Sequence, residues 1–283
     1  MHDNKELLTI SILASIAAGD EILEVYQSDF SVTNKSDNTP LTLADQKSHT
    51  TIMSFLEASA IPVLSEEGRD IPYEKRSKWE RLWIVDPLDG TKEFIKKNDE
   101  FTVNIALVEK GNPVLGVIFI PVTNIVYFAL KGEGCWRLSD PDMIATLKKN
   151  GNENNNDGLF DKILNHSDKL PPEKEAGPFF TVVGSRSHPS PELETFIRQK
   201  EKEYESVRMV SAGSSLKFCL VAEKKADIYP RLGPTMEWDT AAGQAIAENA
   251  GAGVFRVDDG MPLTYNKPDL LNPFFKVYYP GTK

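Results

Sequence analysis

The stretch Trp83-Ile84-Val85-Asp86-Pro87-Leu88-Asp89-Gly90-Thr91 joins an apolar run to two carboxylates. Its apolar part is typical of a buried strand, which would deliver Asp86 to its end. The proline and glycine then favour a turn, so that Asp86 and Asp89 can face one point. Two carboxylates with a main-chain carbonyl suit Mg2+, which prefers oxygen ligands and leaves positions for water and phosphate.

A simpler interpretation is that Asp-Pro-Leu-Asp-Gly is only a turn. Taken alone, the segment favours neither the turn nor the metal site. Acidic groups elsewhere favour the metal site. Glu66 and Glu67 follow an apolar run, and alternation predicts that only one of them meets the metal. Asp239 precedes an apolar helical pattern, where it could instead be the N-cap or a first-turn anion, and both roles can coexist.

Apolar spacing on both sides of this stretch predicts a layered α/β fold with mostly mixed sheets. Helices are expected over residues 4–27, 42–58, 214–223 and 238–250 and after Pro191. Strands are expected at 61–64, 82–85, 101–108, 114–120, 125–130, 134–138, 179–183 and 207–210, with further strands closing the chain.

The length of 283 residues suits one catalytic domain, 1–283. Its N-terminal half, 1–138, would carry most of the candidate metal ligands. Residues 139–177, which contain an Asn- and Gly-rich run, are expected to be a surface insertion or connector. The C-terminal half, 178–283, would carry Asp239 and the substrate contacts.

A formal net charge of −10 argues against binding of a nucleic-acid polymer, and an anionic substrate would need cations in the site. The two cysteines, Cys135 and Cys219, indicate neither a disulfide framework nor a zinc cluster. The run from Leu7 to Ala18 is too short to span a bilayer. We expect a cytoplasmic protein without a transmembrane segment. Peripheral association with the inner face of the membrane and the oligomeric state are left open.

The chain resembles the inositol monophosphatase superfamily of metal-dependent phosphatases. The Glu66-Glu67 pair, the segment 86–91 and Trp238-Asp239-Thr240-Ala241-Ala242 occur in the superfamily's order and approximate spacing. Within that superfamily, Lys92-Glu93-Phe94 after the threonine is similar to the CysQ-type 3'(2'),5'-bisphosphate nucleotidases, as are residues 213–220 and 226–235. The resemblance implies an αβαβα sandwich with mixed sheets, a site between the two halves, and two or more Mg2+ ions.

The resemblance also implies roles for individual residues. Metal ligation would come from Glu66, Asp86, the Leu88 carbonyl, Asp89 and Asp239. Positioning or activation of the attacking water would come from Asp45 and Thr91. The substrate would be held by Ser214, Lys217 and Arg231, with His188 a weaker candidate, and would also contact Glu66, Leu88, Asp89, Gly90, Thr91 and Asp239.

Simpler interpretations stand beside several of these assignments. Asp45 could be only a first-turn partner of the helix dipole, and Thr91 could cap a short helix that begins at Lys92. Lys217 and Arg231 could be solvated surface charges, and His188 could be plain loop.

The predicted reaction is hydrolysis of 3'-phosphoadenosine 5'-phosphate, a small phosphate ester, to AMP and phosphate. The 2',5' isomer and the 5'-phosphosulfate are further candidate substrates, and the reaction would clear a by-product of sulfate assimilation. The alternative enzyme is an inositol or sugar monophosphatase with the same metal core. A non-catalytic nucleotide-binding protein is less favoured, because all expected ligand positions carry acidic side chains or a main-chain carbonyl.

Overall fold

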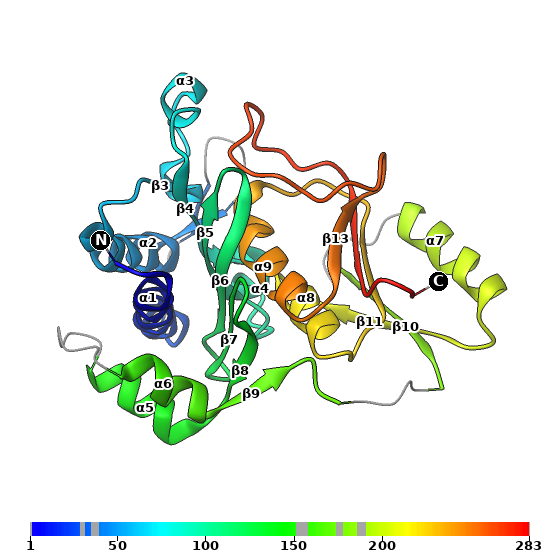
Figure 1. Ribbon diagram of the computed structural model, residues 1–283, viewed down its shortest axis with the longest axis horizontal. Helices are drawn as coiled ribbons and strands as arrows, with labels where there is room; N and C mark the ends of the chain where they lie inside the picture. The colour runs from blue at the N-terminus through cyan, green and yellow to red at the C-terminus, as the bar shows by residue number, and fades with distance from the viewer. Residues whose placement is uncertain are drawn as a thin grey trace.

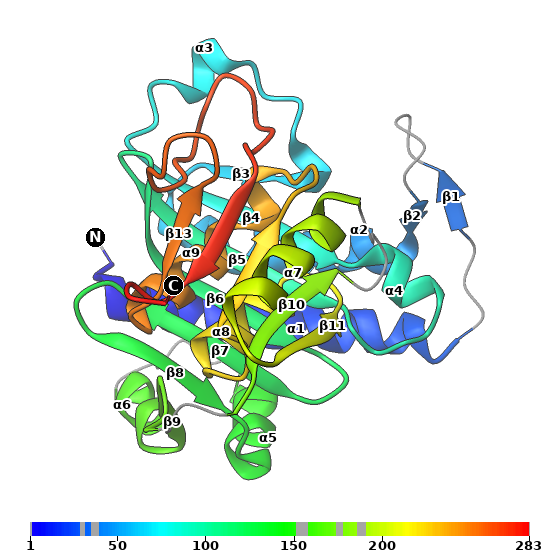
Figure 2. The ribbon, with the colours of Figure 1, turned by 90° about the vertical axis from the view of Figure 1, so that its right-hand side faces the viewer.

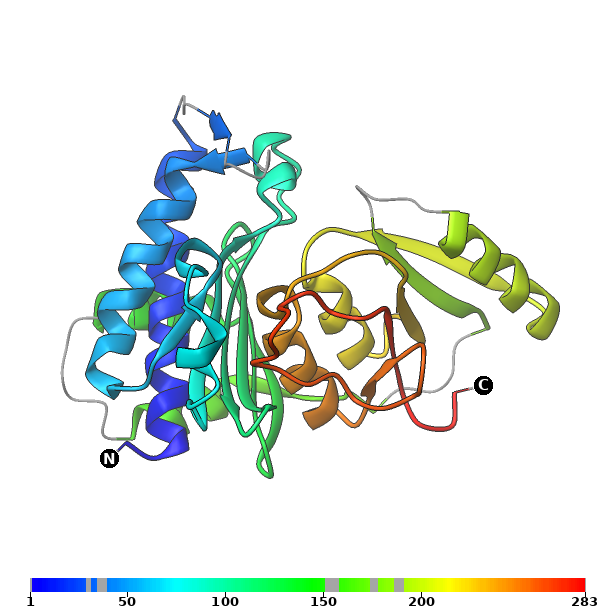
Figure 3. The same cartoon turned by 90° about the horizontal axis from the view of Figure 1, so that it is seen from above.

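The structure, a computed structural model, describes residues 2–28, 32–34, 40–150, 158–173, 178–185 and 191–282. Within these ranges the chain forms five layers, which follow one another from left to right in Figure 3 as helices, sheet, helices, sheet and helix. Both large sheets contain parallel and antiparallel pairs. The predicted αβαβα sandwich with mixed sheets is therefore confirmed.

The larger sheet has seven strands, and both of its faces are covered. Its spatial order follows the sequence: β3 (Val63–Ser65), β4 (Arg81–Asp89), β5 (Thr102–Glu109), β6 (Asn112–Ile120), β7 (Ile125–Leu130), β8 (Gly134–Leu138) and β9 (Ser167–Leu170). β3 runs parallel to β4, and the later neighbours are antiparallel. Alternate residues of each strand enter two separate apolar cores, one on each face.

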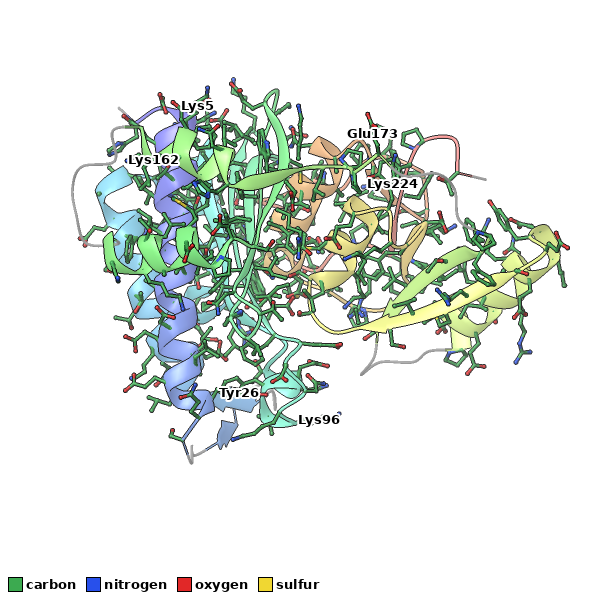
Figure 4. The ribbon with its side chains drawn as sticks, turned by 90° about the horizontal axis from the view of Figure 1, so that it is seen from below. Lys5, Tyr26, Lys96, Lys162, Glu173 and Lys224 are labelled. Carbon is green, nitrogen blue, oxygen red and sulfur yellow. The ribbon has the colours of Figure 1, made fainter. Side chains whose placement is uncertain are left out.

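The outer core lies under α1 (Asn4–Tyr26), α2 (Leu43–Leu56), α5 (Pro141–Asn150) and α6 (Leu159–Asn165). The Tyr26 hydroxyl donates to Asp99 at 2.7 Å, and the Tyr26 ring centroid lies 5.0 Å from those of Phe94 and Phe101. Figure 4 shows Tyr26 at the end of α1 beside Lys96, which follows α4 (Thr91–Ile95). The outer layer therefore anchors the chain just beyond the Asp86–Thr91 segment.

The second core lies between the two sheets and is filled by α8 (Leu216–Ala222) and α9 (Ala241–Asn249) (Figure 1). The smaller sheet has the order β11 (Val207–Ala212), β10 (Phe180–Ser185), β12 (Ile228–Arg231), β14 (Phe275–Tyr278) and β13 (Gly253–Arg256). α7 (Pro191–Glu203) covers its outer side (Figure 2).

Several short elements escape prediction from the sequence. They are β1 (Val32–Asn34), β2 (Pro40–Thr42), α3 (Tyr73–Arg76), β12, and the three elements α5, α6 and β9 within residues 139–177. Met143, Leu147 and Ile163 of α5 and α6 are buried in the outer core, and β9 pairs with β8. Much of this segment is therefore built into the fold, whereas the division into two functional halves stays a prediction.

Gly116 sets how closely α9 approaches the large sheet. A Cβ at this position of β6 would lie 2.7 Å from the Ala242 carbonyl oxygen and 2.8 Å from the Ala245 Cβ. The first atom belongs to the helix backbone, so a side chain rotation could not relieve the clash. Because α9 follows Asp239 directly, this contact also fixes the position of that carboxylate.

We expect Gly116→Ala to lower the free energy of unfolding by about 2–3 kcal/mol, because the added methyl forces α9 away from the sheet. Urea denaturation measures this. Gly68→Ala is the matched control, since a Cβ there meets no atom within 4 Å, and its effect should stay within about 0.5 kcal/mol. Equal stabilities of the two variants would contradict the close approach.

Candidate active site

A β-bulge in β4 brings two carboxylates to one face of the large sheet. Asp86 pairs with Asn104 of β5 and Asp89 pairs with Thr102, so three residue steps on β4 span two on β5. In a regular strand, residues three apart point to opposite faces, and the extra residue cancels that alternation. Leu88 consequently enters the outer core while both aspartates face the helices between the sheets.

The expectation that the strand ends before Asp86 and that Asp86–Asp89 forms a turn is wrong. The strand continues through Asp89, and the turn begins only at Gly90, which has a φ of 95°. Glycine is favoured there because other residues rarely adopt positive φ. Because β4 continues through Asp89, the simpler interpretation of the segment as only a turn is also excluded.

Glu66 reaches the same site from the end of the parallel strand β3. Leu64 faces the core between the sheets, and Glu66, two residues later, lines the cavity beside Asp86. Glu67 turns toward α2. Burial lowers the pKa of His49 on that helix, and the charge of Glu67 partly opposes this shift. The two glutamates therefore diverge as strand alternation predicts.

Asp239 closes the cluster from the C-terminal half of the chain. It ends the 3-10 turn Glu237–Asp239, and its Oδ2 accepts from the Met236 amide at 2.8 Å. Thr240 is the N-cap of α9, so the interpretation of Asp239 as the N-cap of that helix is wrong. One carboxylate oxygen from each of Asp86, Asp89 and Asp239 lies within 4.8 Å of the other two.

Burial and mutual repulsion make the three aspartates hard to ionise together. Burial raises the pKa of Asp89 to about 6 and that of Asp239 to about 8, and the charge of Asp89 adds to the effect on Asp239. Burial also raises the pKa of Asp86 well above its usual range, with contributions from Glu66 and Asp45. A bound cation would offset this repulsion, and an oxygen-only donor set is the kind that hard divalent ions prefer. The cluster therefore fits a metal ion.

A cavity of about 260 Å³ opens over this cluster. Its lining includes an acidic wall, formed by Glu66, Asp86, Asp89, Glu93 and Asp239, and a basic wall, formed by Ser214, Lys217, Tyr229 and Arg231, and Lys92 lines it as well. A neighbouring cavity of about 360 Å³ shares Ser185, Tyr229 and Arg231 with the first and adds apolar lining. The structure thus brings the candidate ligands and three of the four candidate substrate residues to one cavity, and His188 lies outside the described residues.

Two of the three basic residues that line the cavity, Lys217 and Arg231, are held in place. Lys217 is buried, and its Nζ donates to the carbonyls of Ala212, at 3.3 Å, and Ser214. Burial lowers its pKa to about 8, an effect that the nearby charge of Asp89 opposes. Arg231 donates to the Pro234 carbonyl at 2.8 Å. Neither is the freely solvated charge of the simpler interpretation.

Asp45 and Thr91 lie at different depths. Asp45 is buried in the first turn of α2, so its interpretation as a helix-dipole partner stays compatible with the fold, and it is not among the residues that line the cavity. Thr91 lines the cavity, and its hydroxyl donates to the Leu88 carbonyl at 3.4 Å. α4 begins at Thr91 with Gly90 as its N-cap and without a side-chain cap, so the capping interpretation of Thr91 is wrong.

Asn104 was not predicted as a site residue from the sequence. Its side-chain amide donates to Asp89 Oδ2 at 3.3 Å. Thr102 and Ser215 were not predicted either, and their hydroxyls contact the side-chain carbonyl oxygen of Asn104. A signal was present: Thr102 and Asn104 are polar residues at alternate positions of an otherwise apolar strand, and therefore share one face.

The raised aspartate pKa values predict the pH dependence of stability in protein stripped of metal by a chelator. Asp89 and Asp239 bind protons more tightly in the folded than in the unfolded state, where their pKa is about 3.9. The free energy of unfolding should therefore fall as the pH rises from about 4 to about 8. Urea denaturation at several pH values measures this, and saturating Mg2+ should abolish most of the fall. A metal-free protein equally stable at pH 5 and pH 8 would contradict the crowding of the carboxylates.

Known proteins share this architecture over almost the whole chain. The model of the inositol monophosphatase family matches residues 3–276. The protein named 3'(2'),5'-bisphosphate nucleotidase CysQ from Shigella flexneri is 45% identical over 266 residues, which cover 92% of this chain and 94% of that relative.

Solved structures agree. The crystal structure of CysQ from Bacteroides thetaiotaomicron, described as a bacterial member of the inositol monophosphatase family, has a TM-score of 0.87 and 46% identity and covers 98% of both chains. The Thermotoga maritima IMPase TM1415 has a TM-score of 0.69 at 21% identity, covers 95% of this chain and 90% of its own, and shares the fold. In the described residues, no helix combines the length and apolar character needed to cross a membrane.

Proposed function

This chain belongs to the inositol monophosphatase family, and from that premise we propose that it is a Mg2+-dependent 3'(2'),5'-bisphosphate nucleotidase. Its main substrate would be 3'-phosphoadenosine 5'-phosphate, and its products AMP and inorganic phosphate. One water is consumed: its oxygen forms the new bond to phosphorus, the bond from phosphorus to the 3' oxygen breaks, and that oxygen leaves with a proton. The 2',5' isomer and the 5'-phosphosulfate are further substrates of the same chemistry.

The observation that supports this proposal best is a single cavity lined by both a cluster of acidic side chains and the basic side chains Lys217 and Arg231. An acidic wall alone would repel a phosphate ester. We assign Glu66, Asp86, the Leu88 carbonyl, Asp89 and Asp239 to the binding of two or more Mg2+ ions. Bound there, Mg2+ would neutralise phosphoryl charge and lower the pKa of a water.

The side chains around the reacting phosphate then orient the water. The Thr91 hydroxyl can accept a hydrogen bond from a water while it donates to the Leu88 carbonyl. We assign Asp45 and Thr91 to the positioning and activation of this water, as the family resemblance implies. The buried charge of Asp45 acts on Asp86 and so contributes to the negative potential of the acidic wall.

The basic wall suits the second phosphate, which distinguishes a bisphosphate from a simple monoester. We assign Ser214, Lys217 and Arg231 to this part of the substrate, with His188 as an additional candidate. Lys217 donates through Nζ to two carbonyls of the loop before α8, and among the described residues these two contacts leave one of its three N–H groups for a ligand. Arg231 lines both this cavity and the neighbouring one, and a guanidinium suits bidentate binding of phosphate, which favours Arg231 as a phosphate ligand.

Removal of nucleotide by-products of sulfate assimilation in the cytoplasm is the physiological role that we propose. Phosphate release with Mg2+ tests the reaction, with 3'-phosphoadenosine 5'-phosphate and inositol 1-phosphate compared at equal low concentrations. A strong preference for the nucleotide would support the proposal. A preference for inositol 1-phosphate would indicate a monophosphatase, and turnover of neither would indicate the non-catalytic alternative.

We expect Asp89→Asn to lower kcat at least about 100-fold, because it neutralises one carboxylate of the cluster without changing its size. The same variant should be more stable than the parent protein in chelator at pH 8, because one repelling charge is removed. Steady-state kinetics and urea denaturation measure the two effects. Asp142→Asn, on the exposed side of α5, is the control and should change neither. Activity near the parent level would rule out Asp89 as a ligand.

We expect Arg231→Met to lower kcat/KM for 3'-phosphoadenosine 5'-phosphate about 10- to 100-fold, because charge-assisted hydrogen bonds to the second phosphate are lost. For inositol 1-phosphate, which lacks that phosphate, the change should stay within about threefold. Arg256→Met is the control, since Arg256 pairs with Asp258 and Asp259 on the surface. An equal loss on both substrates would argue against this role of Arg231.

A further inference from the structure

Three buried polar side chains form a closed hydrogen-bonded group behind Asp89. Asn104 Oδ1 lies 3.1 Å from Thr102 Oγ1 and 2.7 Å from Ser215 Oγ, and the two hydroxyl oxygens lie 2.8 Å apart. The exposed fractions of Thr102, Asn104 and Ser215 are 0%, 1% and 2%. None of the three lines the cavity, so their contacts act through Asp89 rather than on a ligand.

The group permits only one orientation of the Asn104 amide. Asn104 Nδ2 donates to Asp89 Oδ2 at 3.3 Å. If the amide were rotated by 180°, its carbonyl oxygen would face the Asp89 carboxylate, and two acceptors would meet. In the observed orientation the Asn104 carbonyl oxygen accepts from at least one of the two hydroxyls, because their two protons serve two of the three oxygen–oxygen contacts.

The same group joins the two halves of the molecule. Thr102 and Asn104 lie on β5, and Ser215 directly precedes α8. The loop before Ser215 also contacts Glu100, two residues before β5: the Gly213 amide donates to Glu100 Oε2 at 2.7 Å, and the Ser214 hydroxyl donates to the Glu100 carbonyl at 3.1 Å.

Gly213 allows this approach. A Cβ there would lie 2.8 Å from the Glu100 carbonyl oxygen. Any other residue would push the loop away from β5, and with it Ser215 and the beginning of α8.

We propose that Asn104, held by Thr102 and Ser215, is a positioning residue that orients Asp89 for metal binding and couples it to the loop that carries Ser214 and to the first turn of α8, which carries Lys217. The inference rests on the proposed function, in which Asp89 binds Mg2+ and the loop binds substrate. Hydrogen-bond partners of metal-binding carboxylates fix the carboxylate plane, and their loss typically weakens metal binding or activity about 10- to 100-fold.

The test is a titration of the substrate-free, full-length protein with Mn2+, in which electron paramagnetic resonance measures the free ion. Asn104→Ala should raise the dissociation constant about tenfold. Thr102→Val keeps the side-chain shape but removes one hydroxyl donor, and should raise the dissociation constant about threefold. Thr102→Ser restores the hydroxyl and should bind Mn2+ as the parent protein does, within about twofold.

Kinetics with the nucleotide at saturating Mg2+ give a second readout. An orienting role predicts that Asn104→Ala and Thr102→Val lower kcat while KM changes less than about threefold. Thr9→Val is the control for loss of a buried threonine hydroxyl, since Thr9 bonds only the Lys5 carbonyl within α1 among the described contacts. It should leave both the Mn2+ affinity and kcat unchanged.

Parent-like Mn2+ affinity in both Asn104→Ala and Thr102→Val would overturn the proposal, as would failure of Thr102→Ser to restore the affinity lost in Thr102→Val. If Asn104→Ala does not fold, the comparison of Thr102→Val with Thr102→Ser decides. A parent protein that releases no phosphate from the nucleotide would contradict the proposed function alone, because the Mn2+ series still reports on Asn104.

Discussion

The structure depends on one extra residue in β4. Without the bulge between Asp86 and Asp89, strand alternation would place one of these carboxylates in the apolar core under α1 and α2. With it, both face the layer between the sheets, where Glu66 and Asp239 also arrive. Like charges at such separations are unfavourable on their own, and a cation bound in common, as we propose, would offset their repulsion.

The contact between the N-terminal and C-terminal halves follows from the need to assemble this acidic cluster. The acidic cluster needs Asp239 from the C-terminal half, and the position of Asp239 depends on how closely α9 approaches β6 at Gly116. On the other side of the cavity, Gly213 brings the loop before α8 against β5. The close contacts at Gly116 and Gly213 therefore define the distance between the acidic and the basic wall of the cavity. Substitution of either glycine should disturb both walls.

The sequence predicts the layers and most strands because their apolar periodicity is strong, as in β5 and β6. It also predicts that Asp86 and Asp89 converge, but for the wrong reason, since a bulge cannot be distinguished from a turn in Asp-Pro-Leu-Asp-Gly. Asn104 was missed because its function depends on a cross-strand register and on Ser215, more than 100 residues later. The resemblance predicts Lys217 as a substrate contact, and it lines the cavity, although its burial could not be inferred from neighbouring residues.

The most direct test of the account is a crystal structure of the protein soaked with Mn2+, recorded at a wavelength where manganese scatters anomalously. The account predicts at least one anomalous peak bounded by carboxylate oxygens of Asp86, Asp89 and Asp239, at about 2.0–2.4 Å from each. Crystals without a peak at this cluster, at a Mn2+ concentration that supports turnover, would contradict the claim that the bulge in β4 builds a metal site.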